Sequence, residues 1–74
     1  MEYLIVTFED DRQVVIDGRP QGRTNEVIEV EGGTHLVTLQ VPPYDFRPEE
    51  EALINLEETT ALSPLEVYYE KLES

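Results

Sequence analysis

Residues 14–41 decide the fold, and they read Val14-Val15-Ile16-Asp17-Gly18-Arg19-Pro20-Gln21-Gly22-Arg23-Thr24-Asn25-Glu26-Val27-Ile28-Glu29-Val30-Glu31-Gly32-Gly33-Thr34-His35-Leu36-Val37-Thr38-Leu39-Gln40-Val41. The apolar residues, many of them β-branched, fall into three short runs that are typical of β-strands. Glycine-bearing turns separate the runs. Short strands at this density, with no reactive residue set between them, predict a small scaffold.

Alternating apolar residues predict one strand before this stretch and another after it. Residues 3–8 place every second apolar side chain on one face. The polar connection Glu9-Asp10-Asp11 then leads to the strand around residues 14–16, so we expect a hairpin between the two. Residues 50–57 also alternate and predict a fifth strand, although Leu53 falls on the wrong face. A helix is the alternative there, because Glu and Ala favour helices.

Proline and glycine mark the ends of these strands. Asp17 to Gly22 reads as a turn in which Asp-Gly favours a positive φ. Pro42-Pro43 ends the longest strand, since neither residue can donate to a ladder, and residues 44–48 are expected to form a loop. The pattern predicts a mostly β fold, a small antiparallel β-sandwich of about five to six short strands.

The C-terminal part of the chain has a different character. We expect residues 1–58 to form the sandwich core and residues 59–74 an acidic segment that docks on it. Ser63-Pro64-Leu65-Glu66 fits a helix capping box, and the apolar residues that follow have helical spacing. A short C-terminal helix is therefore expected, with a sixth strand over residues 65–69 as the alternative, because Val and Tyr favour strands.

The chain of 74 residues is short and strongly acidic, with a formal net charge of −12. One domain of this size buries a modest fraction of its surface, so its stability is marginal. Nucleic-acid phosphates and anionic lipids should repel it, so we expect neither a nucleic-acid partner nor membrane insertion. It has no cysteine, which excludes disulfides and thiolate chemistry.

The N-terminus starts without basic residues, and its apolar run is too short for a signal peptide. The sequence as written therefore predicts a cytoplasmic protein. If it is a piece of a longer chain, an envelope-associated location becomes the expectation.

The order of these parts is similar to the PEGA domain, a small bacterial β-sandwich module. The residues that carry the resemblance are Val15-Ile16-Asp17-Gly18, Gly22-Arg23-Thr24, the run 27–30, Glu31-Gly32-Gly33-Thr34-His35, the run 37–41 and Tyr44. The resemblance covers about residues 3–57. It implies a non-enzymatic module of a kind often attached to envelope or signalling proteins, and it brings no catalytic residues.

No group of residues predicts catalysis, a cofactor or a metal. His35 is the only histidine, and we expect it to bond a turn carbonyl or to lie on the sheet surface. The face that it shares with Val37 and Leu39 predicts partial burial. The acidic clusters lack the Asp/Asn-and-Gly spacing of a calcium loop. The glycines are not followed by Lys and Ser or Thr, so they do not form a phosphate loop. We therefore expect no enzyme activity and no cofactor.

Aromatic residues near an arginine are the candidate contact residues, because interfaces are enriched in these types. The candidates are Tyr44, Phe46, Arg47, Tyr68 and Tyr69. Of the first two rings, we expect one to close the core and the other to be exposed. The hypothesis is a module that binds a protein partner, or a second copy of itself, through a sheet edge or the Tyr44/Phe46 loop. The alternative is an acidic regulator that mimics nucleic acid and occupies a basic site on a partner.

Overall fold

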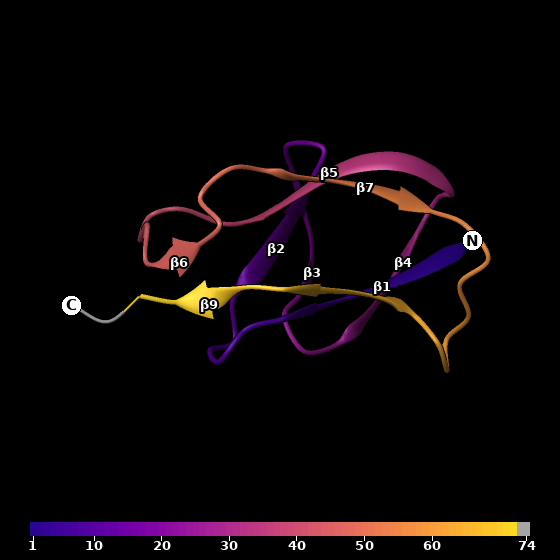
Figure 1. The fold of residues 1–74 in the computed structure, drawn as a ribbon, viewed down its shortest axis with the longest axis horizontal. Helices are drawn as coiled ribbons and strands as arrows, with labels where there is room; N and C mark the ends of the chain where they lie inside the picture. Colours follow the sequence, from indigo (N-terminus) through magenta and orange to yellow (C-terminus); the bar gives the residue numbers. More distant parts are fainter. Residues whose placement is uncertain (73–74) are drawn as a thin grey trace.

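Nine short strands in three sheets make up the part of the chain that the computed structural model describes, residues 1–72 (Figure 1). The strands are β1 (Glu2–Thr7), β2 (Gln13–Ile16), β3 (Arg19–Arg23), β4 (Val27–Val30), β5 (Gly33–Leu39), β6 (Phe46–Arg47), β7 (Ala52–Leu56), β8 (Leu65–Tyr68) and β9 (Glu70–Lys71). The mostly β prediction is confirmed. The count exceeds the expected five to six strands because four of the strands, β3, β6, β8 and β9, arise in segments predicted as turn, loop or helix.

Two of the sheets share one buried core. The three-stranded sheet has the order β4-β1-β8 and the four-stranded sheet the order β3-β2-β5-β7. In β1, β4 and β5 the buried positions alternate with less buried ones, as the period-two pattern predicted, whereas β3 is exposed throughout. The core is formed by Leu4, Val6, Phe8, Val14, Ile16, Ile28, Val30, Val37, Leu39, Phe46, Leu56 and Tyr69.

The C-terminal segment forms strands, so the expected short helix is wrong for the described residues and the alternative of a sixth strand is right. β8 pairs with β1 in parallel, with Leu4 opposite Leu65 and Thr7 opposite Tyr68. The Tyr69 N–H continues this pairing by donating to the Thr7 carbonyl at 2.9 Å. This contact with a distant strand outweighs the local capping signal. Residues 73–74 of the predicted segment lie outside the described residues.

The predicted hairpin between β1 and β2 is also wrong, because the two strands lie in different sheets. Their connection crosses between the sheets beside Thr24 and Asn25, which link β3 to β4. The Thr24 hydroxyl accepts from the Arg12 N–H at 2.9 Å and donates to the Asp10 carbonyl at 2.7 Å. The Asn25 amide donates to the Phe8 carbonyl at 2.8 Å. Side chains thus satisfy backbone groups that no ladder reaches.

The turn predicted over residues 17–22 is shorter than expected. Asp17 and Gly18 have φ values of 52° and 80°. Two successive positive φ values make the tight hairpin turn that Asp-Gly favours, as the sequence indicated. From Arg19 the chain returns as β3, which pairs with β2.

The strand predicted over residues 50–57 is confirmed as β7, which lies at one edge of the four-stranded sheet. Leu53 does point away from the core and is 70% exposed. The predicted loop at residues 44–48 contains a short strand instead. β6 pairs there with β9, with Phe46 opposite Lys71.

Replacing Thr24 by valine tests the two hydrogen bonds by which the Thr24 hydroxyl holds the β1–β2 connection. The side chain keeps its shape but leaves the Arg12 N–H and the Asp10 carbonyl without their partner. We expect a loss of about 1–3 kcal/mol in the free energy of unfolding, measured by urea denaturation. The control Thr34→Val, at an exposed strand position, should change it by less than about 0.5 kcal/mol. Equal effects of the two substitutions would contradict a stabilising role of these hydrogen bonds.

A pair of glycine substitutions tests the approach of β3 to β4. Gly18 and Gly22 have nearly the same φ, 80° and 79°. A Cβ at Gly18 would meet no atom within 4 Å, whereas one at Gly22 would lie 2.6 Å from the buried Ile28 side chain. We expect Gly18→Ala to cost about 1–2 kcal/mol from backbone strain alone. Gly22→Ala should cost at least about 1 kcal/mol more from overpacking, measured by the same unfolding experiment.

Candidate functional site

Two of the five predicted contact residues are buried in an aromatic cluster at the end of the sandwich that carries β6 and β9. Phe46 is 2% exposed, and its ring packs edge-to-face with two other aromatic rings, Phe8 and Tyr69. The Phe46 and Tyr69 centroids are 5.6 Å apart and the Phe46 and Phe8 centroids 6.4 Å apart, both nearly perpendicular. The Tyr69 hydroxyl donates to the Val37 carbonyl at 2.8 Å. Phe46 and Tyr69 therefore close the core and offer no ring to a partner.

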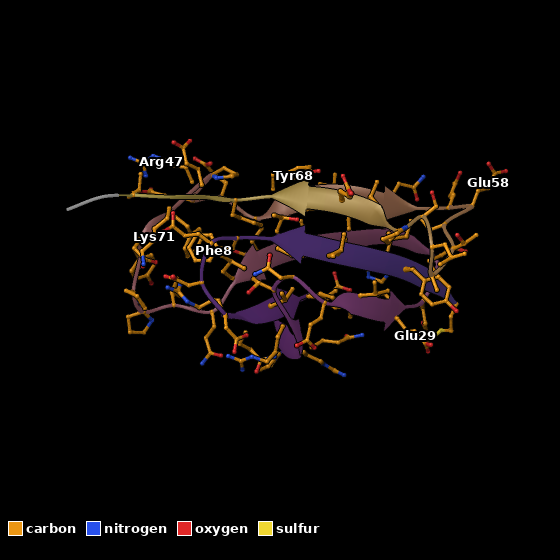
Figure 2. All side chains as sticks on the ribbon, turned by 90° about the horizontal axis from the view of Figure 1, so that it is seen from below. Phe8, Glu29, Arg47, Glu58, Tyr68 and Lys71 are labelled. Carbon is orange, nitrogen blue, oxygen red and sulfur yellow. The ribbon has the colours of Figure 1, made fainter. Side chains whose placement is uncertain are left out.

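The other three predicted residues lie on the surface. Tyr44 is 71% exposed and Tyr68 64% exposed. Arg47 is exposed as well and forms an ion pair with Glu49. Figure 2 shows Arg47 and Lys71 at one end of the molecule and Tyr68 on the outer strand β8, with Glu29 on the opposite edge strand of the same sheet. Of the rings at residues 44 and 46, one is buried and one is displayed to solvent.

Burial and hydrogen bonding change the acidity of the two adjacent tyrosines for different reasons. Burial raises the pKa of Tyr69, since the apolar cluster disfavours a phenolate. The hydrogen bond from the Tyr68 hydroxyl to Glu66 raises the pKa of Tyr68. Both hydroxyls are held protonated, so they act as hydrogen-bond donors at neutral pH.

Arg12 holds the loop before β6 in place, a role that sequence reasoning missed. Its guanidinium donates to both carboxylate oxygens of Asp45, at 3.0 and 3.1 Å, and lies 5.4 Å above the Phe8 ring. It also lies 3.4 Å from the carbonyls of Gln40 and Pro43. The only signal in the sequence was a single cation after an acidic run. Nothing in that signal identifies a partner 33 positions away.

A second ion pair secures the last described strand. The Lys71 ammonium pairs with Asp10, and this hydrogen bond raises the pKa of Lys71. The Leu72 N–H donates to the Asp45 carbonyl at 2.8 Å. These contacts join three segments at one end of the sandwich: β9, the β1–β2 connection, and the loop that precedes β6.

His35 lies on β5 with both ring nitrogens engaged. Its Nδ1 is 2.6 Å from Asp17 Oδ2, and its Nε2 is 2.7 Å from the Glu31 carbonyl. The imidazole side chain is 13% exposed, so both the partial burial and the bond to a turn carbonyl are confirmed. The pair lies in an open groove of about 480 Å³, lined also by Met1, Arg19 and Gln21. His35 ties the β2–β3 turn to the β4–β5 connection.

The contacts of His35 favour its charged form. Both partners can only accept, and a neutral imidazole has one N–H, so an imidazolium alone satisfies both. The hydrogen bond to Asp17, followed by that to the Glu31 carbonyl, raises the pKa of His35 above its ordinary 6.5. The same bond, with the Leu36 N–H that donates to Asp17 at 2.9 Å, lowers the pKa of Asp17. The site is an ion pair that links two turns.

The acidic clusters of residues 1–72 include no group of three or more His, Asp or Glu side chains arranged to hold a metal ion. Within the same residues there is no helix of the length and apolar character needed to cross a membrane.

The paired sheets and the Asp-Gly hairpin define this chain as a small all-β module. It belongs to the PEGA domain family, whose model matches residues 2–66, from the start of β1 into β8. The resemblance drawn from residues 3–57 is therefore confirmed and extends further along the chain. Comparison with curated proteins and with solved structures gives no match.

The His35 ion pair makes stability depend on pH in a defined direction. The folded state raises the pKa of His35, so its contribution is full below about pH 6.5 and is lost as the pH rises through the higher folded value. We expect an NMR titration of the imidazole to give a midpoint above 6.5, and Asp17→Asn to lower that midpoint. The free energy of unfolding should fall as the pH rises from about 6.5 through the folded pKa of His35, and less so in His35→Gln. A wild-type midpoint at or below 6.5 would contradict the ion pair.

Proposed function

We propose that this chain is a non-enzymatic module that binds a protein partner through its exposed aromatic residues and sheet edges. The observation that carries the proposal is the division of the aromatic residues. Phe46 and Tyr69 are buried in the core, whereas Tyr44 and Tyr68 are displayed to solvent beside them in the sequence. Tyrosine is enriched at interfaces because its ring is apolar and its hydroxyl can hydrogen-bond.

The engagement of His35 supports a binding role over a catalytic one. A general base needs a nitrogen with a free lone pair directed at a substrate. Both nitrogens of His35 are within hydrogen-bond distance of residues that hold turns together. The role of this histidine in the proposal is structural.

Site-specific crosslinking tests the proposal, since a chain without cysteine accepts single-cysteine labels. Tyr44→Cys and Tyr68→Cys would carry a photoreactive group, with Glu26→Cys, an exposed position on the β3–β4 connection, as the control. In a lysate of the producing cells we expect one adduct of defined mass at residue 44 or 68 that excess unlabelled chain suppresses. Label at residue 26 should give little. A chain that sediments as a monomer at high concentration and forms no suppressible adduct contradicts the proposal.

The charge distribution favours a second candidate, an acidic regulator that occupies a basic site. Four of the five basic residues pair with nearby carboxylates: Arg12 with Asp45, Arg23 with Asp11, Arg47 with Glu49 and Lys71 with Asp10. This pairing leaves the acidic surplus to set the field at the surface. Binding of this kind should weaken steeply as salt rises from about 0.05 to about 0.5 M, because salt screens surface charges. Salt-insensitive binding would exclude this candidate.

A further inference from the structure

We infer that the outer edge of β7 accepts an extended basic segment of another protein as an added strand. The inference rests on the proposed binding function and names its place and the chemistry of the partner. It follows from the direction of backbone groups in β7, the exposed leucine on it and the charges at both its ends.

The pairing of β5 with its neighbours fixes where the backbone of β7 points. Both backbone polar groups of Leu36 point toward Asp17, at the end of β2. The Leu36 carbonyl accepts from the Asp17 N–H at 2.8 Å, and the Leu36 N–H donates to the Asp17 carboxylate at 2.9 Å. Leu36 also stands opposite Leu53 of β7. Because the polar groups of Leu36 face β2, the pair with Leu53 is of the non-hydrogen-bonded kind. The N–H and carbonyl of Leu53 therefore point to the outer edge, and by alternation those of Asn55 do too.

This edge is open within residues 1–72, where β7 is the last strand of its sheet. Natural proteins guard such edges with proline, lysine or a covering segment. The opposite edge strand, β3, contains Pro20, and its Gln21 side chain donates to the Glu29 carbonyl of β4 at 3.1 Å. β7 reads Ala-Leu-Ile-Asn-Leu and contains neither proline nor lysine.

An apolar contact is available beside the open edge. Leu53 is 70% exposed and its cross-strand neighbour Leu36 40% exposed, on the face of the sheet that points away from the core. An added strand would place one apolar side chain against Leu53, since cross-strand pairs contact each other directly. Backbone groups and one leucine pair thus form a single docking surface.

The charges select the partner. Glu49, Glu50 and Glu51 precede β7, and Glu57 and Glu58 follow it, all with exposed side chains. A second copy of β7 in either direction would bring acidic ends together, and like charges opposite each other destabilise a sheet. An extended segment with apolar residues in its middle and lysine or arginine at both ends complements the apolar strand and its acidic flanks, as in other strand additions.

Amide exchange with a defined peptide tests the inference. The probe is a peptide of about seven residues with valines in its middle and lysines at both ends, roughly the length of one strand. We expect the amide protons of Leu53 and Asn55 to exchange fast in the free protein and to become protected when the peptide binds. A peptide with glutamate in place of lysine, and a basic peptide interrupted by proline, should give no protection.

Two matched variants locate the contact. Leu53→Lys adds a guarding charge at the edge, and Leu62→Lys makes the same change at a leucine that is 99% exposed and lies outside the strands. We expect the first to weaken peptide binding about tenfold or more and the second to change it by less than about twofold. Both variants should keep the amide spectrum of the native fold.

Several outcomes would overturn the inference. Protection of β3 or β8 amides in place of β7 rejects this edge but leaves the binding function standing. Equal binding of the proline-interrupted peptide indicates charge attraction alone, and equal binding of the acidic peptide, or no binding, rejects the stated partner. Conversely, protection at Leu53 without any suppressible crosslink at residues 44 or 68 supports the edge and counts against the aromatic surface of the proposed function.

Discussion

The structure depends on how the chain crosses between its two main sheets. β1 and β2 follow each other in sequence but belong to different sheets, and the hydroxyl of Thr24 holds the connection between them. That hydroxyl accepts a hydrogen bond from the Arg12 N–H, and the Arg12 guanidinium in turn binds Asp45. One buried threonine, 2% exposed, therefore sets the position of the loop that leads Phe46 into the core. A small domain with little core surface needs such directional contacts to define one arrangement.

Local patterns predicted what is local in this fold. Alternation along β1 and β5 gave the buried faces, Asp17-Gly18 gave the hairpin turn, and the partial burial of His35 followed from its face. The partners of the strands could not be predicted in the same way, because a short connection is compatible with either a hairpin or a crossing between sheets. The end of the chain shows the same limit. Local capping favoured a helix at residues 63–66, but hydrogen bonds to β1 made it a strand.

The candidate surface could be predicted as a set of residue types but not as a set of positions. Tyr68 and Tyr69 are adjacent and identical, and only the direction of the strand decides which one is buried. The ion pair between Arg12 and Asp45 could not be predicted, since the pattern of charges along the sequence does not show which distant residues come into contact. The acidic runs around β7 looked like solvated turns, and their meaning as flanks of an open edge requires the sheet order.

The parallel pairing of β1 with β8 also sets the timing of folding. These strands lie far apart in the sequence, yet β8 is the edge strand that completes the sheet, in which β1 is the central strand. The β2–β3 hairpin can close within microseconds because its ends are close together. Parallel contacts between distant segments form slowly, since the chain must first lose the entropy of a long loop. On the ribosome, the edge of β1 that pairs with β8 therefore has no partner strand until residues 65–68 have emerged, and its backbone hydrogen-bonding groups stay open until then.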